Sequence, residues 1–175
     1  MLYIASHQFS THPYSLMRQP PDVRFMQEAI HLSVENVACG HGGPFGAVVV
    51  KDGRIIARGA NSVTRLNDPT AHAEVMAIRE ACAVLNTFQL IGCEIYSSCE
   101  PCPMCLGAIY WARPDALYFA NSKEDAAAIH FDDQFIYEEL ALPLEKRKLF
   151  TRQMLRDDAL EAFKKWAESS AKIEY

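Results

Sequence analysis

Hydrophobic and polar positions follow helical and strand periods in turn along the first part of the chain. After Asp22, which suits a helix N-cap, apolar residues recur every three or four positions, and this spacing predicts a helix over 22–38. Two apolar segments rich in valine and isoleucine, 45–51 and 54–61, then flank an Asp-Gly dipeptide that is typical of a tight turn. We therefore expect a helix followed by a β-hairpin.

The middle of the chain continues this alternation, and its end does so less clearly. Four further elements are expected in the order helix, strand, helix, strand, over 70–85, 94–98, 102–113 and 116–120. Beyond Asn121 the pattern predicts a short helix at 124–129 and a longer amphipathic helix at 154–169, and it leaves 134–140 unassigned. Helices that alternate with strands favour a layered α/β domain.

The length and charge of the chain bound its organisation and its partners. With 175 residues it is long enough for one domain with a sizeable core. Residues 1–21 show no clear period, so we interpret them as an N-terminal extension, disordered in part, and 22–175 as the folded domain. Lysine and arginine total 17 against 22 aspartate and glutamate residues, a formal net charge of −5. Because proteins that grip phosphate backbones usually present a basic surface, this balance argues against nucleic acid as the partner.

Cysteine usage and targeting signals bear on the compartment. Three of the six cysteines, Cys99, Cys102 and Cys105, fall close together with metal-like spacing rather than in a disulfide framework. The N-terminus lacks a charged stretch followed by a continuous apolar run, and no apolar run approaches the roughly 18 residues of a membrane span. We expect a soluble, cytoplasmic protein with reduced cysteines.

Two short motifs carry the candidate chemistry. His72 and Glu74 form an H-x-E motif near the start of the second predicted helix, and Cys102 and Cys105 form a P-C-x-x-C motif at the start of the third. Together they match the signature of zinc-dependent deaminases. One imidazole and two thiolates leave the fourth tetrahedral position of zinc open for water, as in catalytic sites. The two cysteines, three apart on a first helical turn, face one side, and the helix N-terminus favours their thiolates.

Glu74 is expected to move protons rather than to bind the metal. Zinc lowers the pKa of bound water toward roughly 7, and Glu74 can take that proton and pass it to the ring nitrogen and the leaving amine. Each motif alone has a plainer interpretation, since a single histidine is usually structural and C-x-x-C also serves redox or structural zinc sites. Cys99 is a candidate fourth ligand of a structural site, but that site would leave the placement of His72 and Glu74 unexplained.

Longer segments resemble a known family. The following stretches are similar to bacterial guanine deaminases of the cytidine deaminase superfamily: 42–48, 67–74, 98–114, 131–137 and 174–175. The zinc segments also resemble tRNA adenosine deaminases, so the last two stretches are the discriminating ones. The resemblance covers 22–175 and implies a three-layer α/β/α fold with a central mixed five-stranded sheet. It also implies one zinc ion per chain and conversion of guanine to xanthine and ammonia, in purine breakdown or salvage.

The same resemblance implies roles in substrate binding. Phe45 would line the pocket beside the purine ring or stack on it, Asn61 would hydrogen-bond the purine, and Asp133 would accept from its N–H groups, which discriminates against analogues without that donor. Tyr175 would cap the partner's active site in a homodimer that exchanges its C-terminal segments. Trp111 would form pocket wall or packing surface. The plain alternatives are a core phenylalanine, a turn asparagine, a solvated or capping aspartate and a frayed chain end.

Three other functions compete with this interpretation. A tRNA adenosine deaminase would need a basic surface and an open site for a flipped nucleotide, and the net charge of −5 and segment 131–137 argue against it. Another small-base aminohydrolase, acting on cytosine, a pterin or a triazine ring, could use the same pocket. A structural zinc module without activity would have no use for Glu74.

Overall fold

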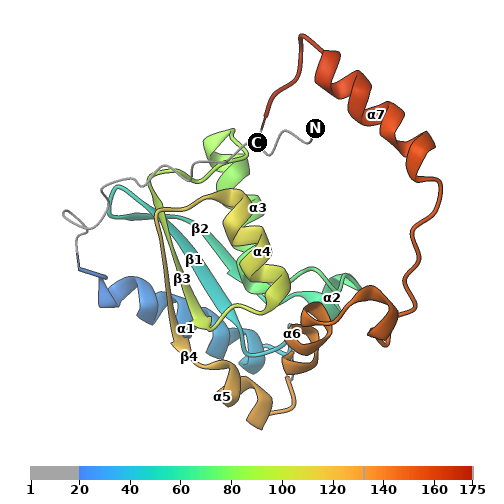
Figure 1. Cartoon of the computed structure of the whole chain (residues 1–175). Helices are drawn as coiled ribbons and strands as arrows, with labels where there is room; N and C mark the ends of the chain where they lie inside the picture. Colours follow the sequence, from blue (N-terminus) through green and yellow to red (C-terminus); the bar gives the residue numbers. More distant parts are fainter. Residues whose placement is uncertain (1–19, 132, 175) are drawn as a thin grey trace.

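The computed structural model describes residues 20–131 and 133–174 (Figure 1). The elements follow in the order α1 (Val23–Ala38), β1 (Gly46–Lys51), β2 (Arg54–Ala60), α2 (Val63–Leu66), α3 (Ala73–Leu85), β3 (Cys93–Cys99), α4 (Pro103–Ala112), β4 (Ala116–Asn121), α5 (Lys123–Ala128), α6 (Gln134–Ala141), the 3-10 helix η1 (Leu144–Lys146) and α7 (Arg156–Glu168). The helices and strands expected from the sequence are confirmed, whereas α2 and α6 were not predicted. The extension expected at 1–21 lies almost wholly outside the described residues.

The described residues form one mixed sheet with the strand order β2-β1-β3-β4. β1 pairs antiparallel with both β2 and β3, and β3 pairs parallel with β4. The resemblance implied five strands, and the structure describes four. After β4 the chain enters a capping box at Ser122 and the alanine-rich helix α5, and then α6 and α7, so no described segment extends the sheet.

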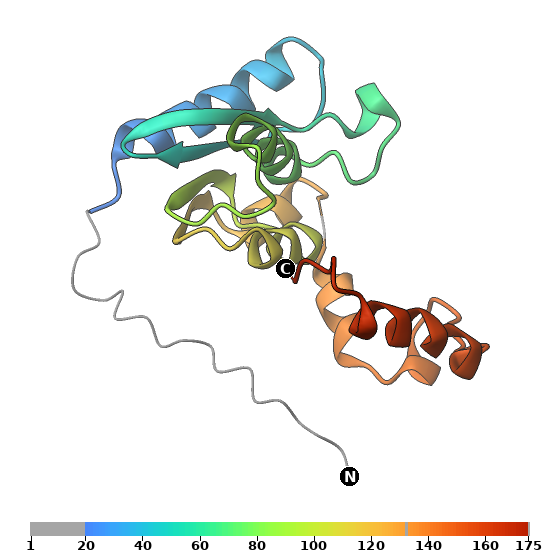
Figure 2. The same cartoon turned by 90° about the horizontal axis from the view of Figure 1, so that it is seen from above.

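Helices cover both faces of the sheet, as expected for a three-layer α/β/α fold (Figures 1 and 2). On one face, α1 packs its buried Ala29 in a cluster with Val48, Val50 and Tyr96. The residues that alternate with these along β1 and β3 belong to the cluster on the other face, which contains α3 and α4. The two central strands, β1 and β3, are therefore buried between two helical layers, whereas β2 is partly buried and the second half of β4 is exposed.

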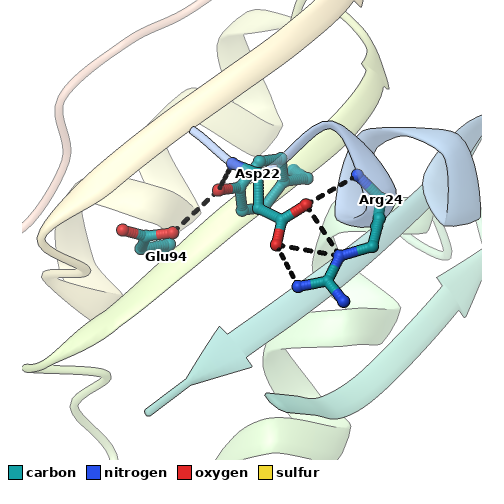
Figure 3. A network of polar contacts seen from close by, with 4 residues as sticks. Asp22, Arg24 and Glu94 are labelled. Carbon is teal, nitrogen blue, oxygen red and sulfur yellow. Dashed lines mark hydrogen bonds and ion pairs between the residues drawn. The ribbon is translucent and has the colours of Figure 1, made fainter. Parts of the chain in front are cut away.

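The start of α1 is tied to β3 by the polar network in Figure 3. As predicted, Asp22 is the N-cap, because its carboxylate accepts from the Arg24 backbone N–H at 2.9 Å and from its guanidinium at 2.6 Å. The Asp22 backbone N–H donates to the Tyr96 hydroxyl at 3.2 Å, which in turn donates to Glu94 at 2.8 Å. Burial is the largest cause that raises the pKa of Tyr96, so this phenol stays a neutral hydrogen-bonding link.

The C-terminal segment 149–168, which includes α7, stands apart from the sheet in both views (Figures 1 and 2). Large apolar side chains along it are 71–86% exposed, namely Leu149, Phe150, Met154, Leu155 and Phe163. A run of exposed apolar side chains of this kind usually marks a surface that a partner covers. Separately, none of the helices in the described ranges has both the length and the apolar character needed to cross a membrane.

Candidate active site

The two predicted metal motifs both lie at helix starts. His72 is the N-cap of α3 and Cys102 the N-cap of α4, each with extended backbone, and Pro103 occupies the first turn of α4. α3 begins three residues later than predicted because Asp68 accepts from both the backbone N–H and the hydroxyl of Thr70, at 2.8 and 2.7 Å. This local turn holds the residues before His72 out of the helix.

The three predicted ligand atoms converge. His72 Nδ1 lies 3.6 Å from the Cys102 sulfur and 3.5 Å from the Cys105 sulfur, and all three atoms lie within 4.8 Å of one another. A tetrahedral zinc ion with Zn–S bonds of about 2.3 Å and a Zn–N bond of about 2.0–2.1 Å requires an N···S separation of about 3.6 Å. The donor set and its spacing therefore fit zinc. Cys99 lies outside this group, and its thiol donates to the Ser122 carbonyl at 3.6 Å.

Without metal, Cys102 is the thiolate of the pair and Cys105 keeps its proton. A hydrogen bond from Cys105 is the largest cause that lowers the pKa of Cys102, to about 4, and the contact with His72 lowers it further. The pKa of Cys105 is raised, first because its thiol donates to Cys102 and second because it is buried. The contact with Cys102 raises the pKa of His72. The bare site thus shares protons among its donors, and metal binding would release them.

Glu74 lies in the first turn of α3, beside the ligands and only 5% exposed. Burial is the largest cause that raises the pKa of its carboxyl group above the ordinary value for glutamate. The Ser97 hydroxyl donates to Glu74 Oε1 at 3.0 Å. Ser97 was not singled out by the sequence, because a serine inside a predicted strand carries no signal of its partner across the fold.

A cavity of about 450 Å³ opens beside the ligands, within the usual range of roughly 300–1,000 Å³ for small-molecule sites. It brings together the predicted chemical and substrate-binding residues His72, Glu74, Cys102, Phe45, Asn61 and Asp133. Of the other predicted residues, Cys105 is buried behind it and Trp111 does not line it. Trp111 is 64% exposed on α4, so the pocket-wall role expected for it is not supported within one chain. Tyr175 lies outside the described residues.

Two aromatic rings form one wall of the cavity. Phe45 and Phe131 meet edge to face, with ring centroids 4.9 Å apart and planes at 89°. Phe45 also packs against the core that contains α3 and α4, so its side chain contacts both the core and the cavity. The half-buried Asp133 lies at the start of α6, and its charge contributes to raising the pKa of His72, which indicates that its carboxylate faces the site.

The segment after β4 is fastened to the start of α4. Tyr137 on α6 donates its hydroxyl hydrogen to the Pro101 carbonyl at 3.4 Å, and the Lys123 ammonium lies 5.3 Å from the centroid of the Tyr137 ring. The Lys123 backbone N–H donates to Glu100 at 3.2 Å. Lys123 and Glu100 also line the cavity. The unpredicted helix α6 therefore helps to build the wall that carries Asp133.

Asn36, which the sequence did not single out, holds the glycine loop at Gly42 and Gly43 that lines the cavity. Its buried side chain donates through Nδ2 to the Gly43 carbonyl at 2.8 Å and to the Asn61 carbonyl at 2.9 Å. Asn61 in turn accepts through Oδ1 from the Gly43 and Val63 backbone N–H groups at 3.3 and 3.4 Å. One amide from α1 thus links the glycine loop to the end of β2.

Replacing Asn36 by alanine is expected to lower the free energy of unfolding by about 2–3 kcal/mol. The change leaves the buried Asn61 carbonyl without the Asn36 donor, which costs about 1–3 kcal/mol. It also removes one of two hydrogen bonds to the Gly43 carbonyl, worth about 0.5–1.5 kcal/mol, since the Phe45 backbone N–H still donates to that carbonyl at 2.8 Å. Urea denaturation of zinc-loaded protein measures the effect. Gln27→Ala, at an exposed position of the same helix, is the control and should change stability by less than about 0.5 kcal/mol. Equal stability of Asn36→Ala and wild type would show that the bridge is dispensable.

Comparison with known proteins identifies the class that this fold and site define. Residues 20–121 match the family model described as the cytidine and deoxycytidylate deaminase zinc-binding region. The chain belongs to the cytidine and deoxycytidylate deaminase family.

Within that family, individual relatives differ in how much of the chain they resemble. Guanine deaminase from Bacillus subtilis strain 168 is 55% identical over 151 residues, which is 86% of this chain and 97% of that protein. The X-ray structure of the Bacillus subtilis enzyme superposes with a TM-score of 0.86 and 53% identity, over 89% of this chain and 99% of that one. A tRNA-specific adenosine deaminase from Aquifex aeolicus is 52% identical over only 77 residues, 44% of this chain and 51% of that protein.

Proposed function

We propose that this chain catalyses the zinc-dependent hydrolytic deamination of guanine, in which guanine and water give xanthine and ammonia. The observation that carries the proposal is one cavity of about 450 Å³ that joins a donor set spaced for zinc, a buried carboxylate and three of the five residues expected to contact the substrate, Phe45, Asn61 and Asp133. A guanine deaminase is 55% identical over 86% of the chain, whereas tRNA adenosine deaminases are 40–52% identical over 44–66% of it, and this difference supports guanine as the substrate.

His72, Cys102 and Cys105 would hold the metal, and the other residues act on the substrate. When bound, zinc supplies a water molecule whose pKa is lowered to roughly 7. Glu74 would take the two protons of that water in turn. One passes to the purine ring nitrogen as the water oxygen bonds to C2, and the other passes to the amino group as its bond to C2 breaks, so ammonia leaves and Glu74 ends the cycle unchanged.

Substrate recognition is assigned to residues that line the cavity. Phe45 packs on the flat face of the base, while Asn61 and Asp133 form hydrogen bonds with its edge. Asp133 is an acceptor for ring N–H groups, and a base without those donors would leave the carboxylate unpaired, which is costly in a half-buried site. This arrangement favours guanine over pyrimidines.

A panel of substrates tests the proposal. Zinc-loaded protein is incubated separately with guanine, adenine, cytosine, a pterin and an anticodon stem-loop RNA, and ammonia release and inosine formation are measured. The proposal predicts that guanine is the preferred substrate and that no inosine forms in the RNA. Inosine without xanthine would instead identify a tRNA adenosine deaminase, and preference for another base would identify a different small-base aminohydrolase.

We also propose that residues 22–175 form a deaminase domain that works as a homodimer with exchanged C-terminal segments. The exposed apolar side chains of 149–163 support this, because a second copy would bury them. Tyr110 and Trp111, 73% and 64% exposed on α4, offer a packing surface on the body of the domain. Tyr175 would close the partner's cavity. The thiolate-rich metal site fits the reducing cytoplasm, in a step of purine breakdown or salvage.

Deleting Tyr175 is expected to lower kcat/KM for guanine at least about tenfold while zinc content stays the same, since tenfold corresponds to only about 1.4 kcal/mol of lost contact with the purine. Steady-state kinetics and metal analysis measure the two effects, and light scattering measures the dimer. Lys172→Ala, in the same segment, is the control. Unchanged kinetics after the deletion would remove Tyr175 from the site.

A further inference from the structure

Ser97 is a polar residue on β3, on a face of the sheet where the neighbouring buried side chains are apolar. β3 alternates its side chains between the two faces, and Ile95 packs in the cluster with α3 and α4 whereas Tyr96 packs in the cluster with α1. Ser97, two residues after Ile95, therefore faces α3, and it is only 2% exposed. A buried hydroxyl group in such a place needs a hydrogen-bond partner.

That partner is the carboxylate expected to move protons. The Ser97 hydroxyl donates to Glu74 Oε1 at 3.0 Å, and both side chains are buried. The next residue, Ser98, is a useful comparison because it is equally buried but has a different hydrogen-bond partner: its hydroxyl accepts from the Gly46 backbone N–H at 3.0 Å. The two adjacent serines of β3 therefore have different hydrogen-bond partners, Glu74 for Ser97 and Gly46 for Ser98.

We propose that Ser97 is a positioning residue that holds the Glu74 carboxylate in the orientation needed for proton transfer. A glutamate side chain has three rotatable bonds, and only part of that freedom is compatible with transfer between a water molecule and a bound base. One donor from the rigid centre of the sheet restricts it. This inference rests on the proposed function, since Glu74 is positioned for that reaction.

The hydrogen bond to a charged group gives the expected size of the effect. If the hydrogen bond from Ser97 is needed to hold Glu74 in the reactive orientation, its loss in Ser97→Ala should lower kcat roughly 10- to 100-fold. KM should stay within about threefold of the wild-type value, because Ser97 does not line the cavity and does not touch the base. Zinc content should remain at one ion per chain.

A double-mutant cycle with Glu74→Gln tests the positioning role directly. If Ser97 acts only through the Glu74 carboxylate, adding Ser97→Ala to Glu74→Gln should change the residual kcat by less than about twofold. A serine that merely stabilises the fold would lower the rate by the same factor in both backgrounds, and that result would overturn the proposal. So would a wild-type kcat in Ser97→Ala itself.

Two further variants separate the hydroxyl group of Ser97 from its contribution to packing. Ser97→Thr retains the hydroxyl and should recover most of the lost kcat, whereas Ser98→Ala should lower thermal stability without the coupling to Glu74→Gln. A Ser97→Thr protein with full zinc, wild-type stability and the low kcat of alanine would contradict the proposal. If Ser97→Ala does not fold, Ser97→Cys, which keeps the volume with a weaker donor, replaces it in the cycle. Wild-type protein that does not turn over guanine refutes the proposed function instead, and the cycle then uses the base that the substrate panel identifies.

Discussion

Glu74→Gln is expected to lower kcat for guanine by roughly 10²- to 10⁴-fold while the protein keeps one zinc ion per chain. Glutamine matches glutamate in shape and can still accept the hydrogen bond from the Ser97 hydroxyl, but it cannot take up a proton at neutral pH. The fold and the metal site should therefore survive the change. Steady-state kinetics and metal analysis of the same preparation measure the result.

The matched control is Glu80→Gln on the same helix. Glu80 is exposed, lies outside the cavity and accepts from the Arg58 backbone N–H at 2.9 Å, which an amide oxygen can also do. We expect its kcat to equal that of the wild type. A Glu74→Gln protein as fast as the wild type would eliminate the proton-transfer role and leave a structural zinc module as the better account.

Cys102→Ala is expected to abolish both zinc binding and turnover. Two remaining ligands hold zinc far more weakly than three, and the lost thiolate is the one whose pKa is lowered to about 4. Metal analysis after gel filtration should find well below the wild-type ratio of zinc to protein, and guanine conversion should fall to the uncatalysed background.

Cys99→Ala separates a three-ligand site from a four-ligand one. The Cys99 thiol contacts the Ser122 carbonyl rather than the other donors, so its loss should leave zinc content unchanged. Stoichiometric zinc in Cys102→Ala would mean that the ligand set is wrong. Loss of zinc from Cys99→Ala would mean that the ion is enclosed by four protein ligands, as in a structural site.

The sequence predicted those parts of the fold and site that depend on local signals. Amphipathic spacing, the Asp22 cap and the Asp-Gly turn are properties of a few neighbouring residues, and the structure confirms the elements that they indicate. The motif residues His72 and Cys102 open helices as expected. Their convergence followed from the motif pair and its known chemistry, not from the periodicity of the chain.

The remaining features depend on contacts between distant residues. Asn36 reaches Asn61 across 25 positions and Ser97 reaches Glu74 across 23, so no pattern within one element could reveal either hydrogen bond. The helix α6 was missed because its position depends on contacts with distant residues, such as that of Tyr137 with Pro101. Trp111 was expected as pocket wall or packing surface on resemblance alone, and its exposed position on α4, outside the cavity lining, could not be inferred from the residue type.

Spectrophotometric conversion of guanine to xanthine, with and without a chelator, tests the central claim most directly. The same preparation is assayed zinc-loaded, after complete removal of the metal, and after zinc is added back. We predict that xanthine forms at a catalytic rate, that the rate disappears when the metal is removed, and that it returns with zinc. No xanthine from fully zinc-loaded protein, or an undiminished rate from protein verified to be free of metal, would contradict the account.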